Sequence, residues 1–259
     1  MKNNSESSPP LASQTLFRGL DVVDAVAKGC RTARDIADHT GLAFSTAHRL
    51  ASALVQVRYL AFEPRHGYRL GTRLLELGFA AYQSSDITRI ARASMEWLAE
   101  QTKDTIHLAQ LDGDEVFYLD KIDGQRPINV NSRIGGRKPV CMTGVGKALI
   151  LDETEDEWRA RYNHDAEQGG LRLQPDAWLG VMRDYAKGGY ALDLEENAPN
   201  VCCVSAPIRD IRGRIVAAIS VTVPTDYTNE AQLRKTIPIV QDAAAEISQK
   251  LGGRPKHGP

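Results

Sequence analysis

The sequence predicts an α+β protein with two domains. Its 259 residues are too many for one small domain and fit a small domain followed by a larger one. Apolar residues recur with helical spacing up to about Lys103, and the pattern then changes to the alternation that is typical of strands. Beyond that point strands are followed by helices, by further strands and by a last helix. This order indicates an α+β domain rather than repeated strand–helix units.

The composition favours a cytoplasmic globular protein. Hydrophobic residues make up 42% and charged residues 25%, as in ordinary soluble domains, and no apolar run approaches the roughly 18 residues of a membrane helix. Residues 1–14 are polar, contain two prolines and predict a disordered tail rather than a signal peptide. The four cysteines have neither disulfide nor zinc spacing. We therefore expect reduced thiols, no metal site and no cofactor.

Three short helices and a hairpin are expected between residues 16 and 70. Their apolar positions are Leu16, Leu20, Val22, Val23, Val26 and Ala27 in the first helix, Ile36 and Ala37 in the second, and Ala47, Leu50, Ala51 and Leu54 in the third. Gly29 and Gly41 end the first two helices, and Thr32 is suited to cap the second. Residues 59–63 and 68–70 then predict two strands around a turn at 64–67.

Residues 33–52 carry the packing signals of a helix-turn-helix. Ala37 stands where two helices cross and only a small side chain fits. Gly41 follows four residues later, in a turn that favours a positive φ. The core behind the second helix is expected to contain Leu42, Ala47 and Leu50. Together with the hairpin, this segment predicts a winged helix-turn-helix, and an ordinary pair of packed helices is the alternative.

The charge distribution fits DNA binding by this segment. Residues 15–73 carry nine Lys/Arg and five Asp/Glu, a net charge of 9 − 5 = +4, whereas the whole chain has a net charge of −1. A basic first third is typical of a DNA-binding head, and a chance fluctuation is the alternative. Ser45, Thr46 and Arg49 are expected to project from the start of the recognition helix toward base edges.

The remaining DNA contacts are expected beside that helix and on the wing. His48 either faces outward with its neighbours or covers the edge of the domain. Arg65, His66 and Arg69 lie near the hairpin tip and suit contacts with phosphates or the minor groove, with a solvated charged turn as the alternative. The full set of expected DNA-binding residues is Thr32, Ser45, Thr46, His48, Arg49, Arg65, His66 and Arg69.

A helical linker and a larger domain are expected to follow. Helices are predicted over 72–84, with Leu75, Phe79 and Tyr82 on one side, and over 87–101, with the domain boundary at 83–86. The predicted strands are 105–111, 116–122, 127–132, 190–193, 202–208 and 215–223, with two or three helices between 143 and 187. A single last helix is expected to carry the apolar stripe Leu233, Ile237, Val240, Ala244, Ile247 and Leu251. The resulting domain limits are a tail at 1–14, a first domain at 15–73, a linker at 74–85, a second domain at 86–252 and a tail at 253–259.

The segment 143–147 suggests a site for a small acid. Thr143 is suited to cap a helix, and the two glycines that follow allow a ligand to approach backbone amides, which favour a carboxylate at a helix start. A phosphate-binding P-loop is excluded, because Cys141 and Ala148 stand where that motif needs Gly and Ser/Thr. An ordinary tight loop is the alternative.

Other reactive residues do not form a catalytic or metal-binding set. Asp193, Glu195 and Glu196 cluster without a clear nucleophile, which is typical of a polar strand end. Cys202 and Cys203 are adjacent, so on a strand they face opposite sides and cannot chelate one metal.

Three stretches resemble the IclR family of bacterial regulators. GLAFSTAHRLASALVQVRYLAFEPRHGYRLG is similar to its winged helix, whereas SRIGGRKPVCMTGVGKALI and GGYALDLEENAPNVCCVSAPIRDIRGRIVAAISVTVP are similar to its effector half. The resemblance implies a GAF/profilin-like domain with a mainly antiparallel sheet, homodimers on an inverted-repeat operator, and dimers of dimers. It implies a small-acid pocket formed by Gly144, Val145, Asp193, Cys203, Ser220 and Thr222.

This sequence departs from the family pattern at two places. Ala43-Phe44 stands where members more often have polar residues or Pro, and an exposed Phe44 either touches a thymine methyl or packs on the turn. Thr222 stands where many members have Ser, which keeps the hydroxyl and adds a methyl.

A subgroup resemblance narrows the expected effector. TKDTIHLAQLDGDEVFYLDKID, followed by SRIGGRKP, looks closest to regulators that respond to 2-keto-3-deoxygluconate and control pectin or uronate breakdown; glyoxylate-type and aromatic acids remain open. The first hypothesis is a repressor of a catabolic operon that is controlled by such an acid. The second is a cytosolic keto-acid-metabolising enzyme with an N-terminal helical docking module, which the sequence disfavours because no His-Asp-Ser or His-Cys set has suggestive spacing.

Overall fold

The computed structural model describes residues 14–84, 86–126 and 132–253. The chain divides into two compact units, Met1–Ser84 and Ser85–Pro259, and each is described by itself. The division falls inside the interval 83–86 expected from the sequence. None of the helices in the described ranges is long and apolar enough to cross a membrane.

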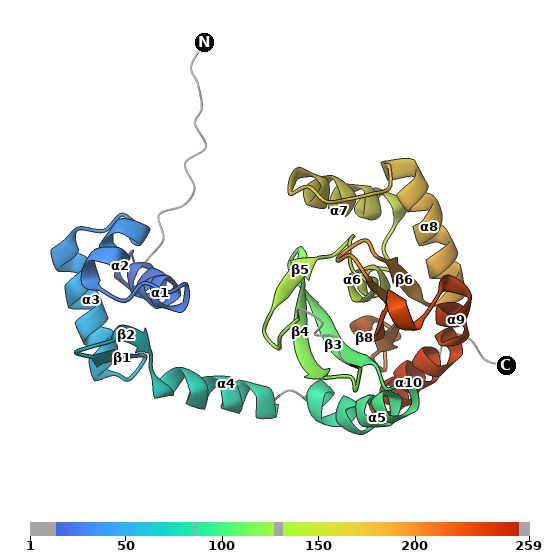
Figure 1. Ribbon diagram of the computed structural model, residues 1–259, viewed down its shortest axis with the longest axis horizontal. Coiled ribbons are helices and arrows are strands. Elements are labelled where there is room, and N and C mark those ends of the chain that lie inside the picture. The colour runs from blue at the N-terminus through green and yellow to red at the C-terminus, as the bar shows by residue number, and fades with distance from the viewer. Residues whose placement is uncertain (1–13, 85, 127–131, 254–259) are drawn as a thin grey trace, which may run out of the picture. The chain divides into compact units, whose positions relative to one another are not determined.

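The first unit is a winged helix-turn-helix (Figure 1). Its elements are α1 (Gln14–Ala27), α2 (Ala33–Thr40), α3 (Phe44–Gln56), β1 (Leu60–Glu63), β2 (Gly67–Leu70) and α4 (Thr72–Ser84). Strands β1 and β2 pair antiparallel, with Phe62 opposite Tyr68. Buried side chains from α1, α2, α3 and both strands form one core.

The buried face of α1 differs from the one expected. Val22, Ala25 and Val26 are buried, whereas Leu16 and Leu20 are 59% and 49% exposed. All buried residues of α1 therefore lie in its second half, where it contacts α2 and α3. The first half keeps an apolar surface that the described residues of the unit do not cover.

Helix α4 likewise has no buried side chain among those described. Leu75 and Phe79 were expected to share one side, and they are 75% and 62% exposed. The side chain of Tyr82 lies outside the described part of the chain. The periodicity of α4 therefore marks an apolar surface and not a core face of this unit.

The second unit is built on a curled antiparallel sheet (Figure 1). Its strands follow the order β5-β4-β3-β8-β7-β6. Their bounds are β3 (Thr105–Asp112), β4 (Glu115–Ile122), β5 (Arg137–Pro139), β6 (Ala191–Leu194), β7 (Val201–Arg209) and β8 (Ile215–Pro224). The alternating pattern and the two turn signals in the sequence explain the hairpins β3–β4 and β7–β8.

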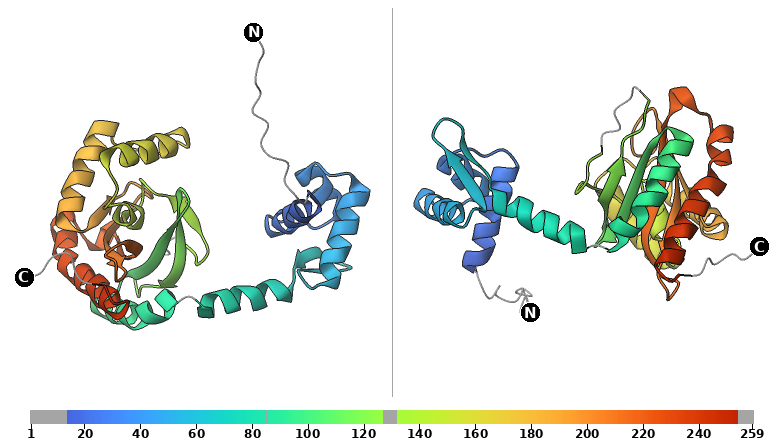
Figure 2. Two further views of the ribbon diagram at one scale, coloured as in Figure 1. Left: turned by 180° about the vertical axis from the view of Figure 1, so that it is seen from behind. Right: turned by 90° about the horizontal axis from the view of Figure 1, so that it is seen from below.

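Helices cover both faces of this sheet (Figure 2). Their bounds are α5 (Asp86–Thr102), α6 (Gly144–Leu149), α7 (Glu155–Glu167), α8 (Pro175–Gly188), α9 (Glu230–Lys235) and α10 (Ile237–Lys250). Helices α5 and α10 pack together against β3, β7 and β8, whereas the short α6 lies within the curve of the sheet against β6, β7 and β8. The position of α6 creates the cavity described below.

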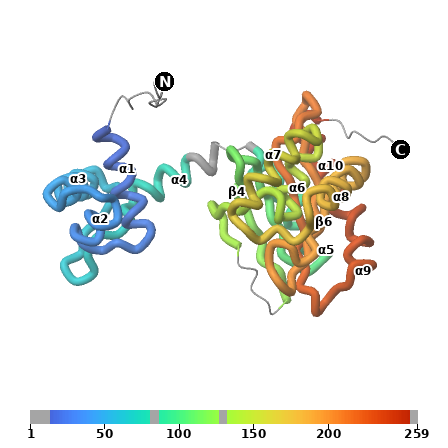
Figure 3. The backbone as a smooth tube through the Cα atoms, turned by 90° about the horizontal axis from the view of Figure 1, so that it is seen from above, coloured from blue at the N-terminus to red at the C-terminus, as the bar shows by residue number. Residues whose placement is uncertain are grey.

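One expectation for this unit falls almost wholly outside the described residues, and another is wrong. The predicted strand 127–132 lies almost wholly outside the described residues, and Ser132 is not in a strand; the strand beside β4 is β5. The predicted last helix is two helices, α9 and α10 (Figure 3), and Thr236 is the residue between them. Pro238 explains the break, because it has no N–H to continue the α9 ladder and is accepted only in a first helical turn.

Candidate functional site

Helix α3 presents a polar face opposite its buried alanines. Ala47 and Ala51 are completely buried against the core, and Ala37 on α2 is 7% exposed. Gly41 ends α2 with a φ of 70°, as its place in the turn requires. Ser45, His48 and Arg49 consequently lie on the exposed face of the recognition helix, whereas Thr46 is half-buried.

A groove of about 420 Å³ lies between α3, the start of α2 and the hairpin. It brings together four of the expected DNA-binding residues, namely Thr32, His48, Arg65 and His66. Thr32 also caps α2, because its hydroxyl accepts the Asp35 N–H at 3.1 Å. Ser45, Thr46, Arg49 and Arg69 lie outside this groove. Arg69 forms an exposed ion pair with Glu63 at 2.6 Å.

Arg31, which the sequence analysis did not single out, fixes the hairpin to the helices. Its carbonyl accepts the Tyr68 N–H at 2.8 Å, and its guanidinium donates to the Tyr68 carbonyl at 3.3 Å. A Cβ at Gly67 would lie 2.1 Å from the same Arg31 carbonyl. Gly67 has a φ of 73°. A glycine at this position is the feature of the sequence that indicates the close approach of the two backbones.

The second unit contains a cavity of about 250 Å³. All six residues implied by the family resemblance line it: Gly144, Val145, Asp193, Cys203, Ser220 and Thr222. Strand register explains the convergence, because Asp193 pairs with Cys203 and Cys203 pairs with Thr222 across three neighbouring strands. Ser220 follows two residues before Thr222 on the same face.

The start of α6 forms one wall of the cavity. The Thr143 hydroxyl accepts the Gly146 N–H at 3.0 Å, and the first amides of a helix have no intrahelical acceptor. A Cβ at Gly144 would lie 2.7 Å from the Ser205 hydroxyl and 3.3 Å from the Cys203 Cβ. Only glycine therefore lets the backbone approach the sheet this closely.

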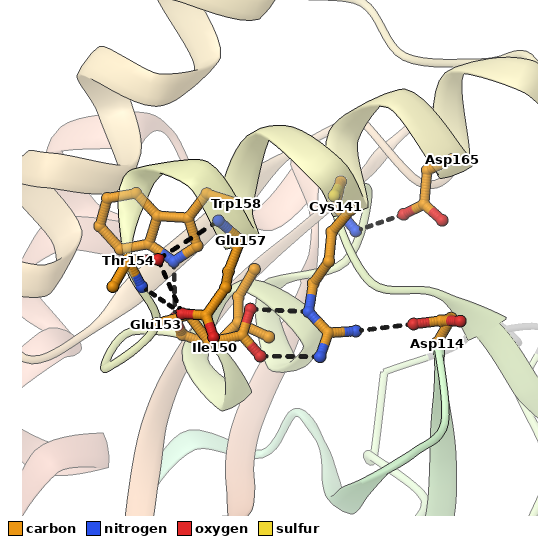
Figure 4. Close-up of polar contacts among 9 residues, drawn as sticks. Asp114, Cys141, Ile150, Glu153, Thr154, Glu157, Trp158 and Asp165 are labelled. Carbon is orange, nitrogen blue, oxygen red and sulfur yellow. Dashed lines mark hydrogen bonds and ion pairs between the residues drawn. The ribbon is translucent and has the colours of Figure 1, made fainter.

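Buried polar contacts hold the segment around α6 in place (Figure 4). The Cys141 N–H donates to Asp165 at 2.8 Å, and the Trp178 indole donates to the Cys141 carbonyl at 3.2 Å. At the other end of α6, the Trp158 indole donates to the Ile150 carbonyl at 2.7 Å. These contacts fix both flanks of the helix that lines the cavity.

Asp193 is the buried acid of the cavity. Burial raises its pKa to about 6, against the opposing effects of Lys147 and of the Glu196 and Asn197 amides. Its Oδ1 accepts the Glu196 N–H at 2.7 Å and the Asn197 N–H at 3.3 Å. None of the hydrogen bonds in the described part of the chain uses Oδ2.

His107 also lines the cavity, although it was not among the pocket residues expected from the sequence. Its pairing with Ser220 on β8, a contact between residues far apart in the chain, brings it there. Its two ring nitrogens lie 2.7 Å from the Ser132 hydroxyl and 3.2 Å from the Thr222 hydroxyl. Burial, assisted by Lys121, lowers its pKa to about 3, so the ring is neutral at physiological pH.

Tyr118 and Lys138 complete the polar lining. Burial raises the pKa of Tyr118 and that of Cys203, so both are protonated at neutral pH. The Cys203 thiol lies 3.2 Å from the Thr222 hydroxyl. Within the described residues no three His, Cys, Asp or Glu side chains are grouped to hold a metal. The cavity therefore suits hydrogen bonding to a polar acid and lacks an activated nucleophile.

Comparison with known proteins identifies the family. The IclR helix-turn-helix domain matches residues 15–64, and the C-terminal domain of the bacterial transcriptional regulator IclR matches residues 79–249. The chain belongs to the IclR family. Members bind DNA through the helix-turn-helix domain and respond to small-molecule effectors, so this IclR-family protein is a DNA-binding transcription regulator and the enzyme hypothesis is wrong. The predicted α+β fold class is confirmed.

Individual IclR relatives cover 80–92% of the chain. The HTH-type transcriptional regulator XynR of Escherichia coli is 33% identical over 245 residues, which cover 92% of this chain and 97% of XynR. The regulator KdgR of the same organism is 32% identical over 214 residues, which cover 80% of this chain and 81% of KdgR. An IclR homologue from Microbacterium hydrocarbonoxydans, solved in complex with 4-hydroxybenzoate, is 25% identical with a TM-score of 0.77 and covers 92% of this chain and 99% of its own.

Proposed function

We propose that this IclR-family protein represses a catabolic operon and responds to a small hydroxylated keto acid such as 2-keto-3-deoxygluconate. The observation that carries the proposal is the convergence of Gly144, Val145, Asp193, Cys203, Ser220 and Thr222 on one cavity. The choice of acid rests on the subgroup resemblance and is supported by the identity with KdgR. A cavity of about 250 Å³ suits a compact sugar acid.

The chemistry of the cavity supports a separate role for each lining residue in binding such an acid. The amides of Gly144 and Val145 at the start of α6 would bind its carboxylate. Asp193 Oδ2 would accept a hydrogen bond from a hydroxyl of the acid, and Ser220 would donate to an oxygen. Thr222 would act chiefly by holding Cys203 and His107, because its hydroxyl already contacts both.

On DNA, α3 would read bases and the hairpin would contact the backbone. Ser45, Thr46 and Arg49 extend from the start of α3, which is the end of a recognition helix that reaches major-groove edges. Thr32, His48, Arg65 and His66 border the groove beside it and would bind phosphates. Arg69 would contribute less, because Glu63 neutralises it.

The protein would bind an inverted repeat as a homodimer, and its sensing units would pair the dimers, as the family resemblance implies. One recognition helix reads few base pairs, so two-fold symmetry is the usual route to specificity. The exposed apolar first half of α1 offers a surface for pairing, with Leu16, Phe17 and Leu20 at 59%, 41% and 49% exposure. Light scattering that detects a monomer with unimpaired operator binding would contradict this proposal.

A thermal-shift screen tests the effector proposal. The chain would be heated with a panel of sugar acids, glyoxylate-type acids and aromatic acids, because a ligand that binds only the folded state raises the unfolding temperature. 2-keto-3-deoxygluconate is expected to produce the largest shift, and Asp193→Ala is expected to remove it. A shift by an aromatic acid alone would reject the sugar-acid assignment.

A further inference from the structure

Lys147 is a completely buried lysine behind the cavity wall. It lies on α6 with 0% of its surface exposed, and its Nζ is 2.6 Å from Glu196 Oε1. The Tyr185 ring centroid lies 5.8 Å from the same nitrogen. A lysine is almost never fully buried unless it is paired, because removing its charge from water is costly. The Glu196 contact is therefore the main compensation for this burial.

Glu196 belongs to the connection between β6 and β7, which forms another wall of the cavity. Asn197, Ala198 and Pro199 of this connection line the cavity. The Glu196 N–H donates to Asp193 Oδ1 at 2.7 Å. One residue thus contacts α6 through its side chain and the buried acid through its backbone.

The backbone of this connection enters the left-handed region at both ends. Glu195 has a φ of 62° and Asn200 a φ of 61°; Asn tolerates this region, whereas Glu seldom occupies it. A side-chain contact links the two ends, because the Asn200 N–H donates to Glu195 Oε2 at 2.8 Å. Such a conformation persists only where surrounding contacts hold it, and the Lys147–Glu196 pair is one of those contacts.

We propose that the Lys147–Glu196 ion pair is a positioning device for effector recognition, an inference that rests on the proposed effector role of the cavity. The pair holds the connection 195–200 against the start of α6. Asp193 Oδ1 then accepts hydrogen bonds from the connection, and Oδ2 remains available to accept one from the acid. Neither Lys147 nor Glu196 touches the effector in this account; both act through Asp193 and the backbone of the connection.

The chain offers a matched control in Arg209 and Asp152. The Arg209 side chain is 9% exposed and pairs with Asp152, but neither residue lines the cavity. Asp152→Asn therefore weakens another charge pair in the same unit, in which the acid is 37% exposed, against 14% for Glu196. A purely structural role of Lys147–Glu196 predicts that both disruptions behave alike.

Hydrogen–deuterium exchange on the full chain tests the positioning without any ligand. Glu196→Gln keeps the size of the side chain and removes its charge, and Lys147→Met is the second variant. We expect the Glu196 and Asn197 amides to exchange about tenfold faster or more in either variant, and to be unchanged in Asp152→Asn. Unchanged exchange in Glu196→Gln, or equal acceleration in the control, would overturn the proposal.

Binding of 2-keto-3-deoxygluconate supplies the functional readout. Its affinity is expected to fall by about tenfold or more in Glu196→Gln, while operator affinity without the acid stays within about twofold of wild type. Wild-type affinity for the acid in a folded Glu196→Gln variant would overturn the positioning role. If the wild type itself does not bind 2-keto-3-deoxygluconate, the proposed effector is wrong, and the exchange experiment still decides the role of the pair.

Phe44 supports a second, independent inference about DNA. It is the first residue of α3 and is 55% exposed. It stacks on His48 with ring centroids 6.3 Å apart, and the Arg34 guanidinium lies 6.0 Å from its ring. Packing on the turn therefore leaves more than half of the side chain uncovered, at the end of the helix that reaches base edges.

We infer that Phe44 reads a thymine, whose C5 methyl is the apolar group in the major groove. The test replaces each thymine of one half-site of a selected operator by uracil, which removes only that methyl. One replacement is expected to weaken wild-type binding by about fourfold, the equivalent of one methyl group, and to have no effect on Phe44→Ala. Phe79→Ala, which truncates another exposed phenyl ring, serves as the control. Equal losses at every uracil for wild type and Phe44→Ala would overturn the inference.

Discussion

Replacing Asp193 by Asn is expected to stabilise the second unit at neutral pH. Asp193 is 2% exposed, and burial raises its pKa from 3.8 to about 6. An acid with a raised pKa holds its proton more tightly in the folded state than in the unfolded chain. The free energy of unfolding therefore falls as pH rises between about 4 and 6, and the penalty is complete above pH 6 and absent below about 4.

The size of the effect follows from that pKa. A rise from 3.8 to about 6 corresponds to on the order of 3 kcal/mol, at about 1.4 kcal/mol for each pH unit. Asp193→Asn keeps an oxygen that can accept the Glu196 and Asn197 N–H groups and has no charge to bury. The free energy of unfolding of the variant should exceed that of the wild type by up to about 3 kcal/mol at pH 7. The two values should be equal near pH 4.

Urea unfolding followed by tryptophan fluorescence measures this difference. All three tryptophans, Trp97, Trp158 and Trp178, lie in the second unit, so the signal reports on that unit. Wild type and Asp193→Asn would be compared from pH 4 to pH 8. The reasoning is refuted if the variant is the less stable protein at pH 7, or if the difference between the two does not change with pH.

Four further substitutions address the DNA surface and the cavity wall. Arg49→Ala is expected to weaken specific binding by about 1–3 kcal/mol; equal losses on operator and random DNA in anisotropy titrations would reduce Arg49 to a phosphate contact. Arg65→Ala should weaken binding to all DNA sequences alike and lower the slope of log K against log salt by about one. A loss of affinity for the operator alone would contradict a phosphate contact by Arg65. Gly144→Ala should abolish the effector response, because its Cβ would lie 2.7 Å from the Ser205 hydroxyl. Adding Ser205→Ala, which removes a buried hydroxyl without a partner among the described residues, should restore part of the thermal shift by the acid, and no recovery would point to another obstacle.

The helix-turn-helix could be predicted because its constraints are local. Ala37 and Gly41 stand four residues apart, and each meets a separate need of the turn. The buried face of α1 could not be predicted in this way. Periodicity identifies an apolar stripe, but the surface that covers it depends on contacts outside the segment. The first half of α1 is not covered by the described residues of its unit.

The cavity was only partly predictable. Its six expected residues came from the family resemblance, whereas His107 was missed because a contact between β3 and β8 joins residues far apart in the chain. Lys147 was noted only as part of a glycine-rich segment, since its burial depends on the approach of Glu196. Pro238 indicates the break between α9 and α10. The apolar stripe continues across this position, and for that reason a single helix was predicted.

Anisotropy titration of a selected operator, with and without 2-keto-3-deoxygluconate, tests the central claim most directly. The cavity lies in the second unit and the recognition helix in the first, so a ligand can regulate only by favouring one state of the DNA-binding units. Wild type is expected to release the operator when the acid is added, whereas Asp193→Ala and Ser220→Ala should bind the operator normally and no longer respond. Variants that still respond at wild-type concentrations of the acid, or that lose operator binding altogether, would contradict the account.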